Sequence, residues 1–170
     1  MRNTTSPLNE LLFKSYITRW LELLIKFIKE FGAEKEEEIW KQLGKLQWME
    51  GRNWIKKNIH KLGIEEDNAI AAKEVVRAGL QTLAPVLYSK KEYEVKEETP
   101  NRVVMEITGW CPILEACKNL GIEPEKPLEY IIRQKLLGML QSINPKLNIR
   151  FSRVDLDNMI REIVIELVEE

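Results

Sequence analysis

The sequence has a single histidine, only two cysteines and no excess of charge of either sign among its 170 residues. No apolar run approaches the roughly 20 residues of a membrane-spanning helix. Arginine and lysine number 26 against 27 acidic residues, for a net charge of −1, so the composition gives no basic surface for nucleic acid. We therefore expect neither a membrane nor a nucleic acid as partner.

The scarcity of cysteine also limits the redox chemistry of the chain. Cys111 and Cys117 are six positions apart, and two cysteines make no disulfide framework. Residues 1–7 lack the charged-then-apolar pattern of a secretion signal. We therefore expect a cytoplasmic protein with free thiols.

The hydrophobic fraction of 44% is enough for a core, and the length fits one α+β domain spanning 1–170. Within it we expect a loose N-terminal arm at 1–6, a helical part at 7–88 and a sheet-containing part at 89–170. The first helix should run from Pro7 to about Phe31. Its apolar residues are so numerous that they exceed one stripe, which favours a homodimer formed through the N-terminal helices. They are Leu12, Phe13, Tyr16, Ile17, Trp20, Leu21, Leu23, Leu24, Ile25, Phe27, Ile28 and Phe31.

Two glycines interrupt the second helical segment, which we expect from about Ala33 to Leu62. Gly44 and Gly51 each cost about 1 kcal/mol relative to alanine inside a helix. They are seven apart and share a face with Trp48. One interpretation is a continuous helix approached closely by another backbone or a ligand. The other is a helix broken by a turn at 50–53.

The hydrophobic period changes near residue 90 from about four to two. A third helix opens at 65–68 and ends at Pro85, after which alternating runs predict a hairpin turning at 98–101. Two more helices follow, at about 112–120 and 127–143, and a second hairpin closes the chain. The order of N-terminal helices followed by ββααββ predicts an α+β fold with a four-stranded antiparallel sheet covered by helices.

The segment 109–117 marks the change from strand to helix. Pro112 suits the first turn of a helix, which places Cys111 at or beside the N-cap. Free backbone N–H groups and the positive end of the helix dipole favour a thiolate or a bound anion there. Cys117 is about one and a half turns later, and we expect it in the core.

Several short motifs suggest a family. They are the FGAEK run at 31–35, the CPILEACKNLG run at 111–121 and the INPKL run at 143–147. With this order of elements the chain resembles the L-2-amino-thiazoline-4-carboxylic acid hydrolase-like family. It is similar more distantly to 4-vinyl reductase domains and trafficking-particle subunits, which share an α+β ligand-binding fold. The resemblance makes Cys111 the motif cysteine. The further cysteines that it implies, around 123–126 and 157–160, are not present here.

Three functional hypotheses follow from these residues. The first is a small-molecule-binding domain of the 4-vinyl reductase or thiazoline hydrolase-like kind, with an apolar pocket near Trp110 and Cys111. The second is a thiol- or metal-assisted hydrolase of a cyclic C–N or C–S bond, with Cys111 as nucleophile or zinc ligand and His60 as base. The third is a dimeric structural interaction module. The residues expected to line the pocket are Trp48, Gly51, Trp54, Met105 and Trp110.

The same residues also have structural interpretations. The tryptophans and Met105 are typical of a core or a subunit interface. Arg150 and Arg153 suit an anionic ligand, but they also suit the solvent face of an edge strand.

Overall fold

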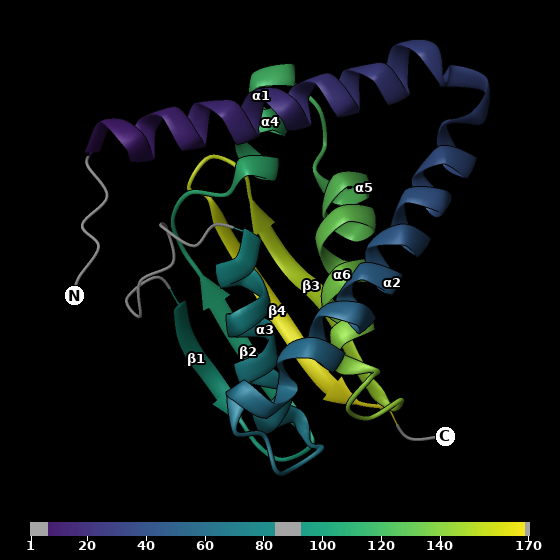
Figure 1. Cartoon of the computed structure of the whole chain (residues 1–170). Helices are drawn as coiled ribbons and strands as arrows, with labels where there is room; N and C mark the ends of the chain where they lie inside the picture. Colours follow the sequence, from purple (N-terminus) through teal and green to yellow (C-terminus); the bar gives the residue numbers. More distant parts are fainter. Residues whose placement is uncertain (1–6, 84–92, 169–170) are drawn as a thin grey trace.

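A computed structural model describes residues 7–83 and 93–168 of the chain (Figure 1). Four elements precede the sheet: α1 (Pro7–Phe31), the short helix η1 (Ala33–Lys35), α2 (Glu36–Leu62) and α3 (Ala69–Leu83). The predicted arm at 1–6, the end of the third helix at Pro85 and the boundary at 88/89 lie outside the described residues.

The remaining elements follow the predicted ββααββ order. The first hairpin is β1 (Tyr93–Glu98) and β2 (Arg102–Ile107), and α4 (Pro112–Leu120) follows it. The long helix is continuous through three labelled parts, which are α5 (Glu125–Pro127), the wider π turn η2 (Leu128–Arg133) and α6 (Gln134–Leu140). The second hairpin is β3 (Leu147–Asp155) and β4 (Ile160–Leu167).

The two hairpins pair edge to edge into one antiparallel sheet with the order β1-β2-β4-β3. Met105 on β2 lies opposite Ile163 on β4, and Ile163 lies opposite Phe151 on β3. Because side chains alternate along a strand, this register collects the apolar residues of three strands on one face. The predicted α+β fold with a four-stranded antiparallel sheet is therefore confirmed.

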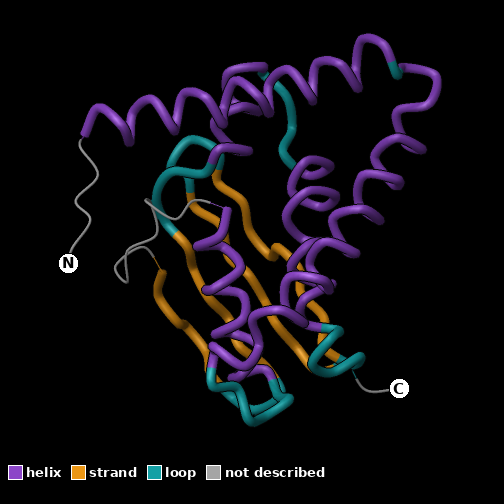
Figure 2. The backbone as a smooth tube through the Cα atoms, in the orientation of Figure 1, coloured by secondary structure: helices purple, strands orange, loops and turns teal. Residues whose placement is uncertain are grey.

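Helices cover the apolar face of the sheet, as Figures 1 and 2 show. The helices α3 and α6 pack directly on the strands, α2 packs on α6, and α1 crosses one end of the molecule against α4. The opposite face carries cross-strand ion pairs, such as those of Arg102 and Arg150 with Glu166 at 3.1 and 3.3 Å. Such exposed pairs contribute little stability and are typical of a solvent face.

The second helix is continuous through both glycines, so the interpretation with a turn at 50–53 is wrong. A Cβ atom at Gly51 would lie 2.0 Å from the carbonyl oxygen of Lys135 on α6. In the same crossing, a Cβ atom at Gly138 would lie 2.1 Å from the carbonyl oxygen of Trp48. The two helices are therefore in backbone contact, and the glycines permit that contact.

Element ends differ by a few residues from those predicted. The second helix starts at Glu36 because residues 33–35 form a separate 3₁₀ turn. The third starts at Ala69, where the side chain of Asn68 accepts a hydrogen bond from the backbone N–H of Ala71 at 3.0 Å. This is an N-cap contact, and it explains why the acidic residues before Asn68 stay outside the helix.

Candidate functional site

The strand-to-helix corner has the predicted form. Cys111 is the N-cap of α4 with an extended backbone (φ −132°, ψ 119°), and Pro112 follows in the first turn. Both thiols are buried, with 1% of Cys111 and none of Cys117 exposed. Burial, with a smaller contribution from the nearby Cys111, raises the pKa of the Cys117 thiol to about 12. A protonated, enclosed thiol is a poor nucleophile, so Cys117 is a core residue.

The predicted catalytic pair is not brought together. His60 is exposed in the last turn of α2. In Figure 1 that end of α2 lies at the opposite end of the molecule from α4, where Cys111 lies. A base must be within about 3 Å of the proton that it accepts, so His60 cannot activate Cys111 in this arrangement.

Trp110 lies where the corner between β2 and α4 packs against the first helix. Its ring N–H donates to the carboxylate of Glu115, which also accepts a hydrogen bond from the hydroxyl of Thr18 at 3.4 Å. The ammonium group of Lys14 lies 5.6 Å from the centre of the Trp110 ring. These contacts give Trp110 a structural role at the junction of α1 and α4.

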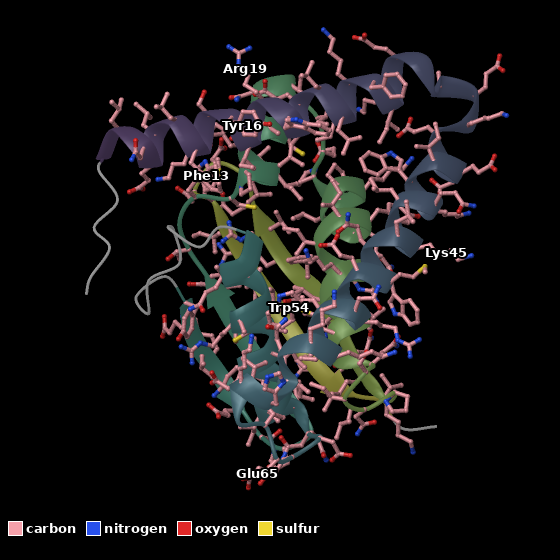
Figure 3. The ribbon with its side chains drawn as sticks, viewed as in Figure 1. Phe13, Tyr16, Arg19, Lys45, Trp54 and Glu65 are labelled. Atoms are coloured by element: carbon pink, nitrogen blue, oxygen red, sulfur yellow. The ribbon has the colours of Figure 1, made fainter. Side chains whose placement is uncertain are left out.

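The other predicted pocket residues are spread over the molecule. Met105 is 1% exposed in the core, and Gly51 faces the backbone of α6. Trp54 packs partly buried against the core near the middle of the molecule (Figure 3). Trp48 is half-buried on α2 and lines a surface groove between α2 and α6. The residues that were predicted from the sequence to line one pocket therefore lie in different parts of the structure.

Arg161 is a buried cation that the sequence analysis missed. It stands on β4 in the same alternation as Ile163, so it faces the core, and only 3% of it is exposed. Its Nη1 donates to the carbonyl oxygen of Gly109 at 3.1 Å, and its Nη2 has no hydrogen-bond partner among the described residues. The available signal was an arginine in register with the apolar side of a strand. Arg161 holds the turn that leads into the Cys111 corner.

The clearest surface feature is an exposed apolar stripe on α1. Its seven large side chains are between 58% and 68% exposed. They repeat at three and four along the side of the helix away from the core, and we call them the α1 stripe. They are Leu8, Leu11, Leu12, Tyr16, Trp20, Leu23 and Phe27. A hollow of about 550 Å³ lies on its C-terminal half, lined partly by Trp20, Leu23 and Phe27.

The described part of the chain contains no cluster of side chains that could bind a metal ion. No group of three or more histidine, cysteine, aspartate or glutamate side chains is close enough there to hold a metal ion. Cys111 belongs to no such group among these residues, and a zinc ion is usually held by three or four ligands of these types. Among the same residues, no helix has the length and apolar character needed to cross a bilayer.

Comparison with solved structures gives an informative likeness in fold. No family model matches the chain, and no curated protein matches it. A solved structure of a trafficking protein particle complex subunit 3 from Naegleria fowleri, covalently bound to palmitic acid, is similar with a TM-score of 0.56. The match covers 95% of this chain and 96% of that one at 14% sequence identity. The predicted likeness to the trafficking-particle fold is confirmed, and the likeness to thiazoline hydrolases has no support from these comparisons.

Proposed function

We propose that this protein is a structural interaction module that pairs with a second copy of itself through the α1 stripe. The observation that carries the proposal is the exposure of the stripe along about five turns of one helix. Among the described residues α1 packs mainly against α4, and its stripe side chains stay exposed (Figure 1). Burying this surface against a partner removes apolar area from water, which is the main driving force for association.

The size of the stripe fits a subunit interface. Seven large side chains that are each about three-fifths exposed present on the order of 700 Å² of apolar surface. The largest apolar patch on a typical monomer is about 300–600 Å². A standard interface buries about 800 Å² on each partner. The stripe therefore supplies most of one side of an ordinary interface.

An interface between identical subunits uses the same patch on both, so the α1 stripe must fit against a second copy of itself. In an antiparallel arrangement of two α1 helices, Leu12 lies opposite the Leu23 position of the second copy. In the same register Tyr16 lies opposite position 19 of the second copy, one residue before Trp20. The hollow on the C-terminal half of α1 then receives aliphatic side chains from the N-terminal half of the other copy.

The solved relative in fold supports this kind of role. It is a subunit of a trafficking protein particle complex and so works within a protein assembly. This chain has a similar arrangement of helices and strands, and such a fold can use part of its surface to bind other proteins. At this level of identity the likeness concerns the fold, and the assembly role of this chain rests on the stripe.

Light scattering coupled to size exclusion tests the proposal. The chain has a mass of 20.0 kDa, and we expect the wild-type protein to elute with twice that mass. A double variant, Trp20→Glu with Leu23→Glu, should elute at the monomer mass. Two charges at the centre of an apolar interface cost several kcal/mol, which corresponds to more than about 100-fold in the dissociation constant.

Leu46→Glu is the matched control because Leu46 is 62% exposed on α2, away from the stripe. It should leave the dimer intact. A wild-type protein that is monomeric at micromolar concentration would end the proposal. A double variant that remains dimeric while folded would move the interface away from α1.

Small-molecule binding near Trp110 and Cys111 is the second candidate, and one observation favours it. The relative in fold carries a covalently bound palmitic acid. In this chain an acyl group on cysteine would require one of two buried thiols. Native mass spectrometry before and after denaturation shows whether the purified protein carries a small molecule. A ligand would appear as added mass on the native protein, and a single apo mass under both conditions would count against the candidate.

A further inference from the structure

A second surface, on α2, has a different chemical character from the α1 stripe. It is a groove of about 450 Å³ between α2 and the long helix formed by η2 and α6, which we call the α2–α6 groove. Two aromatic residues and two lysines line it. Among the described residues no aspartate or glutamate lines it, and the nearby Glu37 accepts a hydrogen bond from the Tyr130 hydroxyl at 3.1 Å. The lining residues are Lys41, Gly44, Lys45, Trp48, Tyr130, Gln134 and Leu137.

The aromatic floor of the groove is held in place by specific contacts. The ring N–H of Trp48 donates to Gln141 Oε1 at 3.0 Å. Tyr130 comes close to α2 because Gly44 has no side chain, and a Cβ atom there would lie 2.8 Å from Tyr130 Cδ1. The Tyr130 ring also stacks against Trp40, with ring centres 6.0 Å apart. A preorganised floor of this kind loses little entropy when a ligand binds.

Four cations extend the groove along α2. Lys41, Lys45, Arg52 and Lys56 recur at spacings of four, seven and four, which places them on one side of the helix. Lys41 faces Glu37 at 3.7 Å in an exposed pair. The guanidinium of Arg52 lies 4.7 Å above the Trp48 ring.

The charge of this side of α2 is left largely uncompensated. For Lys45, Arg52 and Lys56 no carboxylate lies within ion-pair distance in the part of the chain that the structure describes. Figure 3 shows Lys45 on the outer side of α2. The whole chain is nearly neutral, so this is a local concentration of positive charge.

We propose that the α2–α6 groove binds an acidic segment of a partner protein. An apolar or aromatic side chain of that segment packs over Trp48 and Tyr130, and its carboxylates pair with the cations along α2. The cations span 15 residues, or about 22 Å of helix, which matches a peptide and exceeds a small ligand. A second copy that docked through its own groove would present the same positive charge, so we propose a different protein as the partner.

Selection from a displayed library of random peptides about five helical turns long tests the proposal. Wild-type protein should enrich peptides rich in aspartate and glutamate that also carry an aromatic residue. In fluorescence anisotropy, Lys45→Glu with Lys56→Glu should weaken a selected peptide by more than about tenfold, because two attractions become repulsions. Trp48→Ala should weaken it independently of charge.

Lys57→Glu with Lys61→Glu is the matched control because it makes the same change of charge on another side of α2. It should leave the affinity within about twofold. The Trp20→Glu, Leu23→Glu variant should also bind the peptide normally, which separates this proposal from the pairing of α1.

Several results would overturn the inference. A library that yields no enriched peptide, or enriched peptides without acidic residues, would do so. Equal loss in the control variant would also do so, as would phosphatidylserine vesicles that bind through the same lysines when peptides do not. Binding of inorganic phosphate alone at this site would likewise replace the peptide with a small anion.

Discussion

Gly51→Ala is expected to lower the free energy of unfolding by about 3 kcal/mol or more, although alanine normally stabilises a helix by about 1 kcal/mol over glycine. The added Cβ atom would lie 2.0 Å from the carbonyl oxygen of Lys135 and 2.9 Å from the carbon of that carbonyl. Both are backbone atoms of α6, so relief requires the two helices to separate. Urea unfolding followed by circular dichroism measures the loss.

Gly44→Ala is the internal control because it makes the same chemical change one heptad earlier. Its Cβ atom would meet the side chain of Tyr130, with the nearest atom at 2.8 Å. The Tyr130 ring is held by its neighbours but can shift more readily than the backbone of α6, so we expect a smaller loss than for Gly51→Ala, of about 1 kcal/mol. Equal stability of Gly51→Ala and the wild type would show that α2 and α6 are farther apart than the structure has them.

This crossing also shows what a single sequence can predict. The spacing of Gly44 and Gly51 indicated a close approach, because two costly glycines on one face need a reason. The identity of the approaching element was not predictable, since Gly138 lies almost 90 residues later and has no pattern that links it to Gly51. Local periodicity describes one helix at a time, and the partner follows only from the tertiary arrangement.

The sheet was predictable for a related reason. Each hairpin was indicated by alternation and turn residues, and two hairpins leave four edges that gain hydrogen bonds by pairing. The candidate site was less predictable. The N-cap position of Cys111 follows from Pro112, but whether His60 comes near it depends on the direction of α2. The α2–α6 groove was missed for the same reason, because its two walls are far apart in sequence.

Slow labelling of both cysteines is the other large effect that we expect. With a thiol reagent near pH 8, Cys111 and Cys117 in the native protein should react more than about 1,000-fold more slowly than in the unfolded chain. Cys117 is fully enclosed, and its pKa of about 12 leaves almost no thiolate. Cys111 is only 1% exposed. Mass spectrometry of labelled peptides gives the rate at each site.

The raised pKa of Cys117 also predicts how stability depends on pH. The folded protein keeps the thiol proton up to about pH 12, whereas the unfolded chain releases it near the ordinary value of 9.0. The folded state therefore binds more protons above pH 9, and stability falls as the pH rises through that range. By pH 10 the loss should be about 1.4 kcal/mol, and Cys117→Ala should remove it. In the labelling experiment, rapid reaction of Cys111 at neutral pH with slow reaction of Cys117 would contradict our expectation. It would show an accessible thiolate at the α4 corner and so support a nucleophilic role for Cys111.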